Sequence, residues 1–399
     1  MKRVLALLIV LLAVGPAVAG AAAVDDTAVG PAQVNDEQSC EFPVEVEDAT
    51  GETVVIEEEP TRVVTLQANA AQHMWSIGAK DKVVGMPVQD YTSYLNGSEN
   101  RTGILAVGDS GFLSPDIEQV IELEPDLVLA PDITGDTAAD LREAGTTVYQ
   151  YPAISNFEQM YGVVEDVGKL VGACEAAPAT TASVEETVDT IGQAVEDQQA
   201  PDIYYEFSQF TAAPGTIEHD VITRAGGNNI VRESDFDRSY GQLSDELIIQ
   251  RDPEFLILQE GAPIPDSEAI RQTTAVQEDQ IIRINPNFIS QHGPRTVEPL
   301  QTIAEGLFPE TVTQAINNAG STQMENTTEA GSGSSSESGS DSGANTDEET
   351  SESDAEGDDE PADREPTPGA DDDSGGSGLT VVAAAAAIAA VTALLARRQ

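Results

Sequence analysis

Residues 114–129 read SPDIEQVIELEPDLVL, and residues 243–258 read LSDELIIQRDPEFLIL. In each stretch a glutamate, Glu118 or Glu246, opens a short helical pattern, and a proline follows seven residues later. An apolar run typical of a buried strand closes each stretch. The chain therefore contains the same helix-then-strand unit twice. Because each unit lies in a series of strands alternating with helices, the sequence predicts two α/β lobes built on parallel sheets.

A largely helical segment, residues 155–200, separates the two units. Pro178 is expected to divide it into two helices, the second over residues 180–198, because proline breaks a helix interior. At 1.5 Å per residue the second helix would span about 30 Å. We therefore predict two Rossmann-like lobes joined by a helical spine, with a ligand cleft between them and only modest closure.

Seven segments follow from composition and pattern. They are a signal peptide (1–23), an N-terminal segment with a β-hairpin (24–59), an N-terminal lobe (60–154), the helical linker (155–200), a C-terminal lobe (201–318), an acidic Ser/Gly-rich disordered stalk (319–378) and a C-terminal membrane anchor (379–399).

The two ends of the chain predict export and anchoring. Lys2 and Arg3 precede a short apolar core and small residues, as in secretory signals. Residues 379–396 are apolar residues and Thr, followed by Arg397 and Arg398, which suits a membrane helix with its basic end inside. We expect an exported protein anchored at the cell surface.

Acidic residues dominate the composition, with 71 Asp and Glu against 18 Lys and Arg. Residues 322–378 supply 18 of the acids, so most of the acidic excess lies outside this tail. Such a surface suits a salt-rich medium, in which charges are screened over about 3 Å at 1 M salt. It argues against a nucleic-acid partner, because phosphate binding needs a basic face.

Export gives meaning to two further sequence features. Cys40 and Cys174 are the only cysteines, and an even count in an oxidising compartment favours a disulfide, with two buried thiols as the alternative. Three motifs, at Asn96, Asn100 and Asn326, match the N-glycosylation pattern.

The lobes, the spine and several local patterns resemble the substrate-binding proteins of ABC importers for cobalamin and ferric siderophores, which have a helical backbone. The likeness covers residues 60–309 and rests on Arg62-Val-Val-Thr-Leu66, Ile117-Glu-Gln-Val120, Glu124-Pro-Asp-Leu-Val128, Ala225-Gly-Gly-Asn-Asn229 and Gly293-Pro-Arg295. The resemblance implies a monomeric binding protein that is not an enzyme and needs no cofactor, with an ABC permease and its ATPase as partners. The tail resembles the sorting segments of halophilic archaeal surface proteins, but their Pro-Gly-Phe motif is not intact here.

Glu118 and Glu246 have two interpretations. The resemblance implies that these acids dock onto arginines of the permease, where charge pairs fix orientation. Alternatively, each acid favours the dipole of the helix that it opens.

Aromatic and polar residues at predicted loop ends are the ligand candidates, because rings can cover a large, partly apolar ligand. They are Asn69, Tyr91, Tyr94, Phe112, Phe207, Phe210, Tyr240, Phe288 and Arg295. The resemblance places Tyr240 and Arg295 in the cleft. Few cations lie among these loops, which favours cobalamin or a related corrinoid over an anionic ferric siderophore.

Three scattered histidines, His73, His219 and His292, keep haem or metal-ion binding as alternatives. They share no local ligand spacing, so no metal site is predicted. Gly108-Asp-Ser110-Gly111 resembles the loop that carries the nucleophilic serine of chymotrypsin-like proteases, but it leads into a helix pattern, whereas those proteases are all-β. No catalytic residues are therefore predicted.

Overall fold

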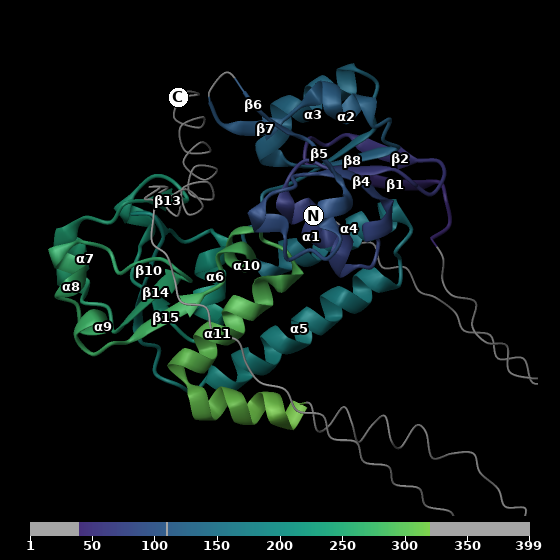
Figure 1. The fold of residues 1–399 in the computed structure, drawn as a ribbon. Coiled ribbons are helices and arrows are strands. Elements are labelled where there is room, and N and C mark those ends of the chain that lie inside the picture. Colours follow the sequence, from purple (N-terminus) through teal and green to yellow (C-terminus); the bar gives the residue numbers. More distant parts are fainter. Residues whose placement is uncertain (1–39, 109–110, 320–399) are drawn as a thin grey trace, which may run out of the picture. The chain divides into compact units, whose positions relative to one another are not determined.

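Two parallel sheets, each interleaved with helices, organise the computed structural model of the protein (Figure 1). The structure describes residues 40–108 and 111–319. The expected signal peptide and anchor, and the stalk beyond residue 319, lie outside the described residues. In the described part of the chain, no helix is both long and apolar enough to cross a membrane.

The first lobe contains five parallel strands in the order β5-β4-β3-β8-β9. The strands are β3 (Val63–Thr65), β4 (Val83–Met86), β5 (Thr102–Gly103), β8 (Leu127–Pro131) and β9 (Val148–Tyr151), and the helices are α1 (Ala68–Ser76), α2 (Ile117–Glu122) and α3 (Gly135–Glu143). Short 3-10 turns lie at η1 (Lys80–Lys82), η2 (Asp90–Thr92), η3 (Ser98–Asn100) and η4 (Asp132–Thr134). The chain passes from β3 to one edge of the sheet and from β8 to the other. A topological switch point therefore lies between β3 and β8.

The second lobe repeats this plan with four parallel strands in the order β12-β10-β14-β15. The strands are β10 (Asp202–Glu206), β12 (Asn228–Asn229), β14 (Phe255–Gln259) and β15 (Ile281–Ile284), and the helices are α6 (Ile217–Arg224), α7 (Asp245–Arg251), α8 (Glu268–Arg271), α9 (Thr274–Gln277), α10 (Pro286–Ser290) and α11 (Val297–Leu307). Turns lie at η5 (Glu233–Asp235) and η6 (Pro294–Thr296). Here the switch point lies between β10 and β14.

Both faces of each sheet are buried, as expected of parallel sheets. In β8, Leu127 and Leu129 belong to the main core, whereas Val128 belongs to a separate core on the other face of the first sheet. In β14, Ile257 belongs to the main core and Leu256 to an outer core of the second lobe. The main core thus runs continuously through both lobes and the spine.

The repeated unit predicted from the sequence is confirmed. Asp116 caps α2 by accepting a hydrogen bond from the Gln119 N–H at 3.2 Å. Ser244 caps α7 in the same way, through the Leu247 N–H at 3.4 Å. These caps satisfy amides that have no partner within the helix.

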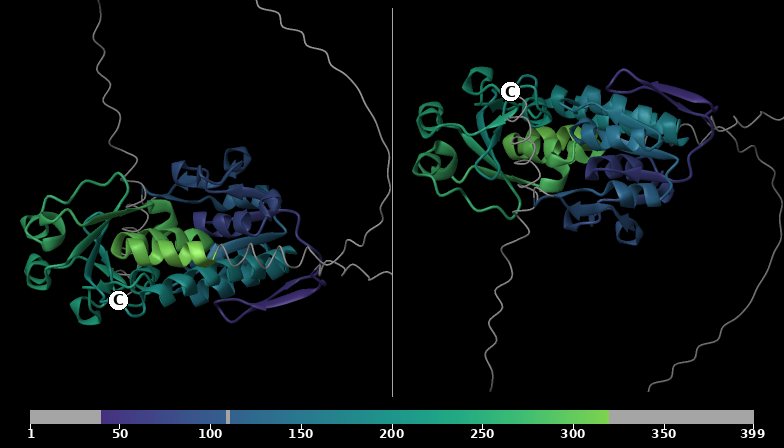
Figure 2. Two further views of the ribbon diagram at one scale, coloured as in Figure 1. Left: turned by 90° about the horizontal axis from the view of Figure 1, so that it is seen from below. Right: turned by 90° about the horizontal axis from the view of Figure 1, so that it is seen from above.

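The spine consists of two helices, α4 (Phe157–Val171) and α5 (Ala176–Val195), which pack on one another. The predicted break at Pro178 is wrong, because α4 ends at Gly172, whose φ of 81° closes the helix. Pro178 instead lies in the first turn of α5, where its missing N–H needs no partner. Figure 2 shows the green helices near the end of the second lobe lying beside the teal α5, and α11 is one that contacts it, so the spine also packs against the second lobe.

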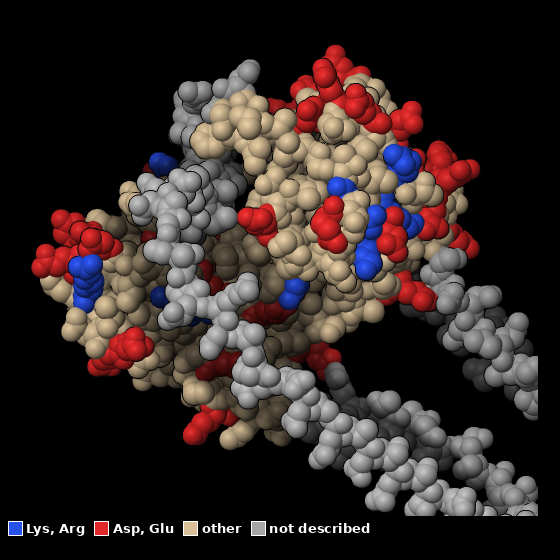
Figure 3. All heavy atoms as spheres, viewed as in Figure 1, with Lys and Arg blue, Asp and Glu red and all other residues tan. Residues whose placement is uncertain are grey.

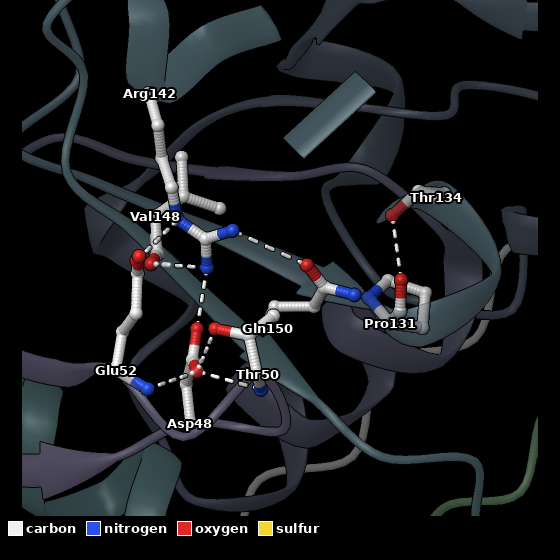
Figure 4. A network of polar contacts seen from close by, with 8 residues as sticks. All are labelled: Asp48, Thr50, Glu52, Pro131, Thr134, Arg142, Val148 and Gln150. Carbon is white, nitrogen blue, oxygen red and sulfur yellow. Dashed lines mark hydrogen bonds and ion pairs between the residues drawn. The ribbon is translucent and has the colours of Figure 1, made fainter. Parts of the chain in front are cut away.

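The N-terminal hairpin, β1 (Val44–Glu47) and β2 (Thr53–Ile56), is fixed to the first lobe by a buried ion pair. The Asp48 carboxylate, with no exposed surface, contacts the guanidinium of Arg142 (Figure 4). Asp48 also accepts from the Thr50 N–H at 2.8 Å, and the Ala49 N–H donates to the carbonyl of Gln150 in β9 at 2.7 Å. A second attachment is the disulfide between Cys40 and Cys174, which joins the start of the described chain to the turn between the spine helices.

Several short elements were not predicted from the sequence. They are the hairpin partner β7 (Leu113–Pro115) of β6 (Leu105–Val107), the pair β11 (Thr211–Ala212) and β13 (Tyr240–Gly241), and helices α8, α9 and α10. Each is five residues or fewer, too short for periodicity to define. The pair β11 and β13 brings Tyr240 beside Phe207, which directly follows β10.

Candidate ligand-binding site

The candidate site lies at the carboxyl ends of strands that border the two switch points, where open α/β sheets bind ligands. Asn69 stands in the first turn of α1, just after β3, and Phe207 directly follows β10. The Asn69 amide oxygen accepts a hydrogen bond from the Tyr151 hydroxyl at 3.0 Å, at the end of β9. Both lobes thus present predicted site residues at equivalent edges.

A chain of amide and phenol groups connects the lobes. The Gln72 Nε2 of α1 donates to the Tyr94 hydroxyl at 2.8 Å, and that hydroxyl donates to the Gln291 Oε1 at 2.5 Å. Gln72 and Gln291 are 0% and 7% exposed, so both amides need partners within the protein. We call Gln72, Tyr94 and Gln291 the lobe-bridging relay.

Two backbone contacts strengthen this connection. The Gln291 Nε2 donates to the carbonyl oxygen of Tyr91 at 2.8 Å, and the Arg295 N–H donates to the Gln72 Oε1 at 3.1 Å. Gly293 permits this approach, since a Cβ there would lie 2.3 Å from that same Gln72 oxygen. The segment after α10 is therefore fitted closely against α1.

Arg295 lies over aromatic rings from both lobes. Its guanidinium carbon is 3.8 Å from the Phe288 ring centre and 5.2 Å from that of Tyr94. Its Nε donates to Glu298 at 2.6 Å, so the positive charge already has a carboxylate partner. The result is a planar, largely neutralised group packed among rings.

A second aromatic group belongs to the C-terminal lobe. Phe207 stacks on Tyr205 with ring centres 5.1 Å apart, and it meets Tyr240 edge-on at 5.9 Å. Phe210 lies 6.4 Å from Phe207. Phe207 and Phe288 are 5% and 7% exposed, so each also serves the packing of the lobe.

Glu218 links this aromatic group to the first lobe. The buried carboxylate accepts a hydrogen bond from the Tyr240 hydroxyl at 3.0 Å, and its Oε1 lies 3.4 Å from the His292 Nε2. The His292 carbonyl oxygen is in turn 3.4 Å from the His73 Nε2 of α1. Polar contacts therefore continue from the second lobe into the first.

Burial moves the pKa of several of these groups further from neutral pH. It lowers the pKa of His73 to about 4, even though the His292 carbonyl favours the protonated ring. It raises the pKa of Tyr94 to about 12, against the opposing effect of the Gln72 amide. Burial and then the charge of Glu218 raise the pKa of Tyr240 well above its ordinary value. The site offers rings, amides and phenols rather than net charge.

Eight of the nine predicted ligand residues are joined by the contacts described above. The ninth, Phe112, lies between β6 and β7 and is 45% exposed. The Nδ1 of His219 pairs with the Asn229 side chain at 3.2 Å. Among residues 40–108 and 111–319, no three His, Cys, Asp or Glu side chains are grouped to hold a metal ion.

Sequence reasoning missed five members of the region, namely Gln72, Tyr151, Tyr205, Glu218 and Gln291. Glu218 resembled an ordinary first-turn acid, and the glutamines carried no motif. Their partners lie far away in sequence, as Tyr94 and Gln291 do, 197 residues apart.

The two predicted docking acids occupy matching places. Glu118 and Glu246 each lie in the first turn of a helix, and both are exposed. The structure shows no ion pair for either carboxylate with the residues it describes. Figure 3 shows other acidic side chains gathered on the visible faces of both lobes.

Comparison with known proteins identifies the class. A family model described as periplasmic binding protein matches residues 63–288, more than half of the chain, and the chain therefore belongs to that family. The family is one of substrate-binding proteins, not of enzymes.

Individual relatives agree with this class. The chain is 36% identical over 296 residues to a cobalamin-binding protein of Halobacterium salinarum, covering 71% of this chain and 79% of the relative. The solved periplasmic vitamin B12 binding protein of Vibrio cholerae is 20% identical, with a TM-score of 0.53 over 64% of this chain and 98% of that one. An ABC-type Fe3+-hydroxamate transport structure from Saccharomonospora viridis is 23% identical, with a TM-score of 0.55 over 67% and 100%. These structural likenesses confirm the two-lobed α/β fold.

Proposed function

We propose that this protein captures cobalamin or a related corrinoid outside the cytoplasm and delivers it to the permease of an ABC importer. The observation that carries the proposal is the 36% identity, over most of both chains, to the Halobacterium cobalamin-binding protein.

The chemistry of the candidate site supports a corrinoid. Cobalamin is large, carries many amides and bears little net charge, so it suits a surface of rings, phenols and amides. Tyr240, Phe207 and Arg295 supply such a surface. The charge of Arg295 is already paired with Glu298, and the Glu218 carboxylate accepts a hydrogen bond from the Tyr240 hydroxyl.

A ferric siderophore is the second candidate, because a hydroxamate transport structure shares the fold. An anionic chelate needs several convergent cations. Arg295 is the one arginine of the candidate region, and it is bonded to Glu298. A haem would need an accessible axial ligand such as an imidazole, whereas His73 is fully buried and the Nε2 of His292 already lies 3.4 Å from the Glu218 carboxylate. We therefore place both below the corrinoid.

Capture involves binding without chemistry. The continuous core and the two-helix spine restrict the lobes to a small closure over the ligand. Ligand binding promotes docking of the protein on the permease only to the extent that the ligand binds the closed form better than the open form. In this proposal, Glu118 and Glu246 are the docking acids, one for each lobe, and anchoring at the cell surface keeps the protein near its transporter.

Calorimetric titration of the full-length protein with cyanocobalamin in concentrated KCl tests the ligand. We expect one-to-one binding that weakens at least about tenfold, or about 1.4 kcal/mol, in Tyr240→Ala and Arg295→Ala. Arg271→Ala is the matched control, because Arg271 is exposed and pairs with Asp266 away from the site. Binding of a ferric hydroxamate or haem in place of the corrinoid would replace our ligand assignment.

Stimulation of the importer's ATPase tests docking. We expect Glu118→Gln and Glu246→Gln each to raise the concentration needed for half-maximal stimulation about tenfold, through loss of a charge-assisted contact. Glu122→Gln, an exposed acid at the other end of α2, should behave as the unaltered protein. Unchanged stimulation in both docking variants would leave these acids with only their favourable interaction with the helix dipole.

A further inference from the structure

Two N-glycosylation motifs stand close together in the loop between β4 and β5. They are Asn96-Gly97-Ser98 and Asn100-Arg101-Thr102, and they match the sequence pattern equally well. Transfer of a sugar needs both an accessible asparagine amide and an accessible hydroxyl two residues later. In the structure the two motifs differ in the second requirement, the accessibility of the hydroxyl.

The first motif has a hidden hydroxyl. Asn96 is exposed, but Ser98 is only 2% exposed. The Ser98 Oγ donates to the Thr92 carbonyl oxygen at 3.0 Å. The carbonyl oxygen of Asn96 is also fixed, because it accepts from the Trp75 Nε1 at 3.0 Å. Presenting this motif to an enzyme would require opening the turn.

The second motif is accessible at both positions. Asn100 and Thr102 are exposed, and within the described part of the chain no side-chain hydrogen bond involves the Thr102 hydroxyl. The Asn100 Nδ2 donates only to the Glu99 Oε1, at 3.1 Å. Glu99 is itself exposed, so water can replace that contact at little cost.

We propose that Asn100, and not Asn96, carries an N-linked oligosaccharide in the exported protein. The donor is a lipid-phosphate-linked oligosaccharide. The Asn100 Nδ2 forms a bond to the anomeric carbon and loses one proton to a base, while the bond from that carbon to phosphate breaks and the lipid phosphate leaves with the electron pair. The proposal rests on the extracytoplasmic location within the proposed function.

The position gives the sugar a physical consequence. Thr102 begins β5, which lies at the edge of the first sheet and, among the residues that the structure describes, pairs with β4 alone. Exposed strand edges invite pairing with other chains. A neutral, bulky sugar beside β5 covers this edge. Additional charge would protect it less on an already acidic protein, because salt screens charge.

Mass spectrometry of the protein isolated from its native cells tests the proposal. Fragmentation of the peptide spanning residues 83–101 should place the sugar mass on Asn100 and none on Asn96. Asn100→Gln and Thr102→Ala should lose the mass, whereas Thr102→Ser and Asn96→Gln should keep it. Sugar on Asn96, or an unmodified Asn100, would overturn the proposal.

The same preparation should be titrated with cyanocobalamin. Saturable binding by a protein whose Asn100 is unmodified overturns the glycosylation proposal and leaves the ligand proposal standing. A protein with sugar on Asn100 that does not bind cyanocobalamin supports the glycosylation proposal and overturns the ligand proposal. Asn326 lies outside the described residues, and its peptide is read in the same experiment without bearing on Asn100.

Discussion

His73 is a fully buried residue at the junction of the lobes, and its protonation opposes folding. Its pKa is about 4 in the folded protein against 6.5 for an unperturbed histidine. The folded state therefore binds the proton more weakly than the unfolded state. The contribution of His73 to the free energy of unfolding is fully present above pH 6.5. It is lost as the pH falls from 6.5 toward 4, by up to about 3 kcal/mol.

Guanidinium unfolding at pH 7.5 and 4.5 measures this effect. We expect the unaltered protein to lose more stability between these two pH values than His73→Gln, which cannot titrate there. The comparison with the variant is essential, because the many carboxylates also contribute to the pH dependence. An equal loss in both proteins would show that His73 does not take part.

At the scale of elements, the lobe-bridging relay joins α1 and the loop after η2 to the segment after α10. Tyr94→Phe removes the hydroxyl that serves two buried amides, and we expect a loss of about 1–3 kcal/mol in unfolding free energy. Because Gln291 shares that hydroxyl, combining Tyr94→Phe with Gln291→Leu should cost less than the sum of the single changes.

Tyr91→Phe is the matched control for the relay. Gln291 contacts Tyr91 through its backbone carbonyl, which the substitution keeps. We expect a change within about 0.5 kcal/mol. Strict additivity of the Tyr94 and Gln291 changes would mean that the relay does not couple the lobes.

The elements that the sequence predicted well have local causes. The unit containing α2 and β8, and its copy containing α7 and β14, could be recognised because cap, apolar periodicity and proline lie within one short stretch. The end of α4 was misplaced, because Pro178 suggested a break and the actual stop at Gly172 is a C-cap.

The candidate site was predictable only in part, for a related reason. Tyr240 and Arg295 were chosen as aromatic and cationic residues in loops, and the structure places them in the connected region. The partners that orient them, such as Glu218 and Gln72, could not be paired beforehand. Those contacts depend on how the two lobes meet, and no local sequence pattern encodes the way in which they meet.

At the scale of the whole molecule, the Cys40–Cys174 disulfide closes a loop over a sequence separation of 134 residues. Restricting the unfolded chain in this way contributes up to about 5 kcal/mol in the loop-entropy estimate. We expect Cys40→Ser with Cys174→Ser to lower the unfolding midpoint in high salt. Asp48 and Arg142 should still hold the hairpin to the first lobe.

Reduction of the unaltered protein with dithiothreitol provides the control for this prediction. It should lower the midpoint by the same amount as the double substitution and have no effect on the substituted protein. Equal midpoints for the oxidised and reduced protein would mean that the folded contacts alone set its stability.

Trp75 is the only tryptophan in the chain, and it lies on the same helix as Gln72 and His73. Its indole Nε1 donates a hydrogen bond to the backbone carbonyl oxygen of Asn96, and the Arg101 guanidinium carbon lies 5.9 Å from its ring centre. The intrinsic fluorescence of the protein therefore has a single indole source, at the first lobe's side of the junction. A chromophoric ligand brought close to α1 would quench that emission in the unlabelled protein, whereas rearrangements confined to α7, α8 or α9 would leave it unchanged.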